Sequence, residues 1–237
     1  MELKPKFLRN FLMAIKIVLF LASILSLTVG AHLLFYKIVI RVFTITGPAL
    51  KTLLLIVLLL LALSFMASFL LLQWQENPLT VWFYKFSAIW IGLFLHLLPA
   101  VLASWIIIAA IRISGSYAPA RWIAAVCIVA AVLYSAYGVW NAFHPRIKRL
   151  EVQFENLPHQ WKNKTILHLS DVHLGHFYGT EFLNDLVRKV NALNPEAILI
   201  TGDLFDGMAT TISHFAVGLD QLRAKKGVFF VTGNHET

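Results

Sequence analysis

Twenty consecutive residues, 53–72, read LLLIVLLLLALSFMASFLLL and contain no charged side chain. The hydrocarbon core of a bilayer is about 30 Å thick, and a helix of roughly 20 apolar residues crosses it. A run of this length and purity is typical of a membrane-spanning helix. The sequence therefore predicts an integral membrane protein.

Three further apolar blocks, residues 11–35, 86–111 and 122–140, have the length of spans. Hydrophobic residues make up 59% of the chain, above the roughly 45–50% of ordinary globular domains. Trp122 and Trp140 flank the last block, at the level where lipid headgroups lie. The sequence thus predicts four transmembrane helices, and the chain is expected to be a multi-pass membrane protein.

The N-terminus is basic and precedes an apolar run, as in a signal peptide. The run is longer than a signal-peptide core and has no small-residue cleavage site after it, so we interpret it as a retained helix. Four spans place both ends of the chain on one side. Seven Lys and Arg flank the spans on that side and five on the other, which favours a cytoplasmic location for the hydrophilic tail.

Ionisable side chains inside spans often serve transport, and His32 and His96 raise that alternative. No Asp or Glu occurs within the four spans, so a proton relay lacks partners. Neutral histidines also hydrogen-bond neighbouring helices, and we favour that interpretation. The net charge of +8 is explained by Lys and Arg at span ends, so no nucleic-acid partner is expected. The single cysteine, Cys127, excludes a disulfide framework or a thiolate zinc site within one chain.

After Asn141 charged residues become frequent, and we predict three regions. Residues 1–145 form the four-helix transmembrane domain, 146–164 a linker with a lead-in strand, and 165–237 a separate domain. The lead-in strand is indicated by strict alternation of apolar and polar residues over 150–154.

The tail shows an alternation of strands and helices. Short β-rich runs at 165–170, 197–201 and 228–232 predict strands, the last two continuous enough to be buried on both faces. Apolar spacing of three and four predicts helices over 181–193 and 208–222. The order β-α-β-α-β predicts a mostly parallel sheet with right-handed crossovers.

Each predicted strand ends in polar residues. Asp171 and His173 follow the first strand, Asp203 the second, and Gly-Asn-His-Glu at 233–236 the third. Ligands of open α/β sheets bind beyond the carboxyl ends of the strands. Oxygen and imidazole donors without thiolate favour manganese, iron or zinc, so the sequence predicts a divalent-metal site at this edge.

The motifs D-V-H-L-G at 171–175, G-D-L at 202–204 and G-N-H-E at 233–236 together resemble the opening motifs of calcineurin-like metallophosphoesterases. The flanking residues from 166 onward most resemble the bacterial membrane-associated branch of that family. The resemblance covers 165–237 and implies a layered α/β/β/α domain.

Carried over residue by residue, the resemblance implies two divalent metal ions. Asp171 and His173 would hold the first metal, Asp203 would bridge both, and Asn234 would ligate the second. His235 would be catalytic, contacting the phosphate and protonating the leaving group.

The same resemblance implies that Glu236 orients His235. The implied activity is hydrolysis of a phosphomonoester, phosphodiester or pyrophosphate bond, and a membrane tether suits a phospholipid or lipid-linked substrate. The alternative is a catalytically inactive membrane scaffold or sensor.

Members of the family complete the site with later histidines, one alone and then a G-H-x-H motif. Residues 165–237 contain neither. The expectation from the sequence is therefore an incomplete domain in a fragment or truncated product, and a chain that is inactive by itself.

Overall fold

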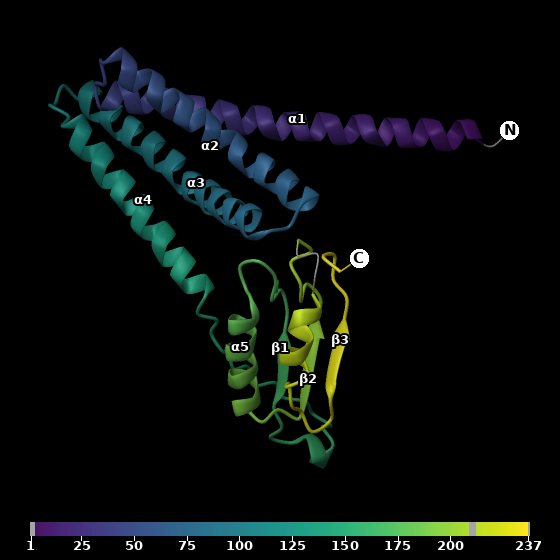
Figure 1. The fold of residues 1–237 in the computed structure, drawn as a ribbon. Helices are drawn as coiled ribbons and strands as arrows, with labels where there is room; N and C mark the ends of the chain where they lie inside the picture. Colours follow the sequence, from purple (N-terminus) through teal and green to yellow (C-terminus); the bar gives the residue numbers. More distant parts are fainter. Residues whose placement is uncertain (1–2, 209–211, 237) are drawn as a thin grey trace. The chain divides into compact units, whose positions relative to one another are not determined.

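The computed structural model describes residues 3–208 and 212–236. The chain divides into two compact units, Met1–Val139 and Trp140–Thr237, which we call the membrane unit and the second unit (Figure 1). The membrane unit is helical, and the second unit holds a small parallel sheet.

Four long helices cover the four predicted spans, which confirms that these segments are helical. They are α1 (Leu3–Val42), α2 (Pro48–Trp74), α3 (Pro78–Ile113) and α4 (Ala120–Ala142). All four are long and apolar enough to cross a membrane. Each extends beyond its apolar block, because helix ends are set by capping groups and turns as well as by hydropathy.

The start of α3 is an example of a helix end set by capping groups. The Asn77 side chain accepts hydrogen bonds from the backbone N–H groups of Leu79 and Thr80, and the Thr80 hydroxyl accepts one from the Asn77 N–H. Pro78 occupies the first helical position, where its missing N–H costs nothing. The turn between α2 and α3 is therefore encoded locally.

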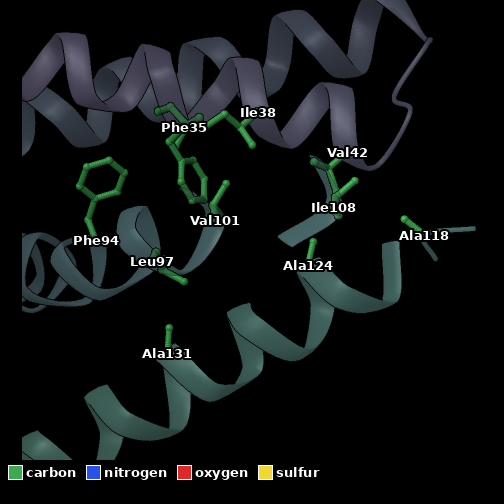
Figure 2. Close-up of a cluster of buried hydrophobic side chains, with 11 residues drawn as sticks. Phe35, Ile38, Val42, Phe94, Leu97, Val101, Ile108, Ala118, Ala124 and Ala131 are labelled. Carbon is green, nitrogen blue, oxygen red and sulfur yellow. The ribbon is translucent and has the colours of Figure 1, made fainter. Parts of the chain in front are cut away.

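Apolar side chains from several helices meet inside the membrane unit. Figure 2 shows Phe35 and Ile38 of α1 near Val101 of α3, and Val42 of α1 near Ile108 of α3, while Ala131 of α4 belongs to the same cluster. Most other large apolar side chains of these helices are exposed. An apolar exterior is what a helix surrounded by lipid requires.

The two intramembrane histidines are both hydrogen-bonded between helices. His32 is fully buried; its Nε2 accepts a bond from Trp90 Nε1 at 3.2 Å, and its Nδ1 lies 2.8 Å from the Thr28 carbonyl oxygen. His96 Nδ1 lies 3.0 Å from Ser135 Oγ. These contacts fit the helix-packing interpretation and give transport no support.

The second unit contains three parallel strands in the order β1-β2-β3, which confirms the predicted parallel sheet. Its elements are β1 (Ile166–Leu169), α5 (Thr180–Ala192), β2 (Ala197–Thr201), α6 (Ala216–Leu219) and β3 (Val228–Val231). Two 3-10 turns, His159–Trp161 and Ser213–Phe215, lie outside them.

A compact apolar core joins α5 to one face of the sheet. Val187 and Val190 of α5 pack with Ile198 and Ile200 of β2, and Phe215 is fully buried in the same cluster. The helical spacing of the α5 side chains produces this single buried stripe.

The prediction that β2 and β3 are buried on both faces is wrong for the described residues. Leu199 is 37% exposed, Phe229 55% and Val231 60%. Paired registers place these three residues with His168 and Thr201 on one side of the sheet. The apolar core lies against the other side, and β3 is an edge strand of the described sheet.

Two predicted elements are also corrected. Residues 150–154 are exposed and form no strand; a strand requires a pairing partner, and β1 pairs with β2 alone among the described residues. The helix predicted over 208–222 is reduced to α6 and the turn before it, and 209–211 lie outside the described residues. Gly218, which packs against Leu183, lowers the helix propensity there.

Candidate metal centre

The loops that follow β1 and β2 are joined by backbone hydrogen bonds. The Asp171 N–H donates to the Gly202 carbonyl at 3.3 Å, and the His173 N–H donates to the Asp203 carbonyl at 3.0 Å. The sheet register thus continues past the strand ends. Asp203 and His173, 30 positions apart in the chain, are held side by side as a result.

Three predicted site residues have backbone conformations that side-chain-bearing residues rarely adopt. The φ angles of Asp171, His173 and Asp203 are +55°, +52° and +50°. Left-handed backbone costs a non-glycine residue of order 1–3 kcal/mol and recurs at functional sites. Asp171 and His173, two residues apart, are both turned in this way in the loop after β1.

The side chains of His173, Asp203 and His235 converge. Their potential ligand atoms all lie within 4.8 Å of one another, and the two imidazole rings are 4.8 Å apart at nearly right angles. One carboxylate and two imidazoles, without a thiolate, are suited to a divalent ion such as manganese, iron or zinc. These residues therefore fit the expected metal chemistry.

His235 is positioned by two hydrogen bonds. Its backbone N–H donates to Asp203 Oδ1 at 3.0 Å, and its Nδ1 lies 3.0 Å from the Asp206 carbonyl oxygen. A carbonyl only accepts, so Nδ1 carries a proton, and in the neutral ring Nε2 holds the lone pair. That nitrogen can ligate a metal or, once protonated, donate to a phosphate oxygen.

The Glu236 carboxylate joins the loops that follow β2 and β3. It accepts hydrogen bonds from the backbone N–H groups of Asp203 at 3.0 Å, Phe205 at 3.0 Å and Gly233 at 2.7 Å. Desolvation raises the pKa of Glu236, but the backbone donors together hold it below its ordinary value. Glu236 thus positions Asp203, whereas the sequence suggested that it orients His235, whose ring nitrogen lies against the Asp206 carbonyl instead.

Replacing Glu236→Gln should loosen this junction. A glutamine presents one oxygen and an NH₂ group, so a backbone donor loses its acceptor and the charge is removed. We expect amide hydrogen exchange at Asp203 and Phe205 to accelerate about tenfold or more. Hydrogen-exchange mass spectrometry of the chain in detergent measures this. Glu181→Gln, in the exposed first turn of α5, is the control, and equal exchange in both variants would contradict the assigned role.

Two glycines allow the loops to meet. A Cβ on Gly233 would lie 2.3 Å from Asp203 Oδ1 and 2.6 Å from the Asp203 backbone nitrogen. A Cβ on Gly202, whose φ is +82°, would lie 2.7 Å from the Gly233 Cα. The immediate neighbours of these two glycines in the structure are each other and Asp203.

Of the other two predicted metal ligands, Asp171 lies outside the cluster of carboxylate and imidazole groups. Asp171 is exposed, and its carboxylate accepts a hydrogen bond from the Ser170 hydroxyl. Asn234 is exposed and precedes His235 in the loop after β3. Their assignment as ligands stays a prediction.

Asp206 has a structural role that was not predicted from the sequence. Its carboxylate accepts hydrogen bonds from the backbone N–H groups of His176 and Met208, at 3.3 and 2.9 Å. A Cβ on Gly175 would collide with this carboxylate at 1.9 Å. The available signal was a second Asp three positions after Asp203, in the same loop.

The second unit thus combines a parallel α/β sheet with carboxylate and imidazole side chains beyond the ends of its strands. A family model described as calcineurin-like phosphoesterase matches residues 164–237. Residues 164–237 therefore belong to the calcineurin-like phosphoesterase family. The predicted resemblance is confirmed.

Two of the curated relatives are named as transmembrane proteins with a metallophosphoesterase domain. The chain is 36% identical over 124 residues to a zebrafish (Danio rerio) protein called transmembrane protein with metallophosphoesterase domain, covering 52% of this chain and 28% of the relative. The bovine (Bos taurus) protein of that name is 37% identical over 113 residues, 47% of this chain and 26% of its own. An uncharacterized metallophosphoesterase of Campylobacter jejuni is 33% identical over 110 residues, 46% and 29% of the two chains.

These matches are longer than residues 164–237, so the similarity extends into the residues before the domain. They include animal as well as bacterial proteins, a wider range than the bacterial branch suggested by the motifs. The chain spans a little over a quarter of the length of these relatives, 26–29%. No solved structure matches the chain.

Proposed function

We propose that this chain contributes the membrane anchor and the first metal-binding loops of a metal-dependent phosphoesterase. The reaction is hydrolysis of a phosphomonoester, phosphodiester or pyrophosphate bond. The convergence of His173, Asp203 and His235 within 4.8 Å carries the proposal. Membership of residues 164–237 in the calcineurin-like phosphoesterase family supports it.

Each side chain has a role that its geometry permits. Asp203 and His173 would supply metal ligands, and Asp171 and Asn234 would add further ligands for two ions. Two divalent ions, when bound, activate water and neutralise phosphate charge. His235 contacts the substrate phosphate and donates a proton to the leaving group through Nε2, since its Nδ1 is engaged by the Asp206 carbonyl oxygen.

His235 also lies within the metal-ligand cluster, which supports a second role for the same side chain. Ligation and proton donation both require Nε2, so they exclude each other at one moment. Metal binding and hydrolysis by a His235→Ala variant separate them: unchanged affinity with lost hydrolysis assigns the residue to catalysis, and a large loss of affinity assigns it to the metal.

The membrane helices favour a substrate that is itself at the bilayer, either a phospholipid or another lipid-linked phosphate. We place the second unit on the cytoplasmic side, following the excess of Lys and Arg on the side of both chain ends. Nucleic acid is not an expected substrate.

The test is metal-dependent hydrolysis of bis-p-nitrophenyl phosphate by the purified protein in detergent. Residues 1–237 are compared with any longer product of the same reading frame. We expect a chelator to reduce hydrolysis to background and manganese to restore it, because the donor set is suited to that ion. Electron paramagnetic resonance of added Mn²⁺ reports binding separately from turnover.

Activity of a longer product alone would show that residues 1–237 need further ligands. Manganese binding without hydrolysis of this substrate or of phospholipid vesicles, by either protein, would favour the scaffold or sensor alternative. Absence of manganese, iron and zinc binding in both proteins would contradict the proposed site.

A further inference from the structure

The residues that follow α4 combine basic and apolar side chains where the chain leaves the last apolar helix. Helix α4 has 23 residues, and at 1.5 Å per residue it is slightly longer than a bilayer core of about 30 Å. Ala142 at its end therefore lies at headgroup level when the helix spans. Arg146 follows within at most about 14 Å of extended chain.

Residues 143–150, which we call the juxtamembrane segment, expose their apolar side chains. Phe143 is 42% exposed, Ile147 55% and Leu150 72%. Residues 145–150 are in neither helix nor strand. Alternating apolar and cationic side chains suit the boundary between acyl chains and headgroups, where apolar groups enter the membrane and charges remain in water.

The basic side chains of this segment are available for an anion. Arg146 reaches Asn141 Oδ1 at 3.3 Å, and Lys148 and Arg149 have no ion pair or side-chain hydrogen bond within the described part of the chain. The nearest acidic residues, Glu151 and Glu155, come later. Positive charge is therefore concentrated on the part of the segment next to the membrane.

The segment is attached to the loop that carries the first metal motif. The Tyr178 hydroxyl donates to the Ala142 carbonyl at 3.1 Å, and the Tyr178 ring meets Phe143 edge-on at 5.3 Å. Both contacts lie inside the second unit. Tyr178 belongs to the loop between β1 and α5, so whatever holds the segment at a surface also holds this loop.

We propose that the juxtamembrane segment is a binding site for anionic lipid headgroups. Arg146, Lys148 and Arg149 pair with lipid phosphates, and the apolar side chains between them enter the interface. Each basic residue near an anionic surface is expected to strengthen the association about fivefold. This binding is independent of the proposed hydrolysis, because none of these residues lies in the metal centre.

The test places a fluorophore in the segment of the full chain. Leu150→Cys in a Cys127→Ser background is labelled with an environment-sensitive dye, and the protein is reconstituted in phosphatidylcholine vesicles with increasing phosphatidylglycerol. We expect a blue-shifted emission, quenched by headgroup-level lipid quenchers, as the anionic lipid increases. Arg146, Lys148 and Arg149 are then replaced together by Gln. The ratio of phosphatidylglycerol to phosphatidylcholine that gives half of the emission change should rise at least tenfold. Each lost charge is expected to weaken the association about fivefold, so tenfold is a lower bound for three charges.

A matched control removes the same charge elsewhere in the second unit. Lys162→Gln, Lys189→Gln and Arg223→Gln alter exposed residues outside the segment and should leave the response unchanged. Equal emission in neutral and anionic vesicles would overturn the proposal, as would an equal loss in the control.

Two further results would overturn it by pointing to other roles. Protease accessibility reports the orientation of the chain in the vesicles. If the triple substitution inverts the chain, and the correctly oriented molecules still show the normal emission change, the basic residues determine only the topology. If an acidic polypeptide shifts the emission and anionic lipid does not, the segment binds protein.

Discussion

Asp203→Asn is expected to reduce Mn²⁺ affinity at least about 100-fold. It should also abolish metal-dependent hydrolysis by whichever protein, residues 1–237 or a longer product, hydrolyses the substrate. Outer partners of metal ligands already contribute about 10–100-fold to affinity, and Asp203 provides the carboxylate of the His173–Asp203–His235 cluster. Asparagine has nearly the same shape, and its oxygen can still accept the His235 backbone N–H. The substitution therefore removes charge with little change in the loop.

Mn²⁺ binding and hydrolysis should be measured on the same preparation, with Asp220→Asn as the control. Asp220 is exposed at the end of α6 and belongs to no metal cluster among the described residues. We expect the control to match the unmodified chain in both assays. Unchanged Mn²⁺ affinity in Asp203→Asn would show that the metal does not depend on this carboxylate.

Gly233→Ala is expected to reduce hydrolysis by about 100-fold without altering any ligand. The new Cβ would lie 2.6 Å from the Asp203 backbone nitrogen and 2.3 Å from its Oδ1. Backbone cannot give way as a flexible side chain does, so Asp203 must shift. Misplacing a reacting group by about 1 Å can cost roughly 100-fold in rate.

Gly179→Ala is the matched control, because an added Cβ at Gly179 would meet no atom within 4 Å and its φ is negative. Activity and Mn²⁺ affinity are compared at equal folded fraction, determined by circular dichroism. Loss of both in Gly233→Ala, with a normal control, is the expected result. Full activity in Gly233→Ala would mean that the close approach of Gly233 to Asp203 is not required.

Local patterns in the sequence were sufficient to predict several helices and strands. Four apolar runs predicted four helices because a bilayer imposes both length and composition on anything that crosses it. The strand at 197–201 was predicted with its observed ends. A short apolar run between Pro195 and Gly202 leaves few other conformations.

Sequence alone was unreliable where an element depends on a partner. Alternation at 150–154 predicted a strand, yet a strand forms only against a neighbour, and these residues pair with none among the described residues. Burial of β3 was predicted from its composition, although burial depends on what covers each face. Phe229 and Val231 face away from the core, and Val228 and Phe230 on the core side are exposed as well, because β3 is an edge strand that contributes no described residue to the core cluster.

The sequence by itself determined that this protein has membrane-type helices followed by a parallel sheet whose strands end in motifs of carboxylate and imidazole residues, because hydropathy and short motifs are local properties. Only the tertiary structure decided which side chains share the site. It brought His235 to His173 and Asp203, assigned the Glu236 carboxylate to three backbone amides, and left Asp171 outside the cluster. Those relations depend on how three loops meet in space, and residue spacing along one chain does not specify that.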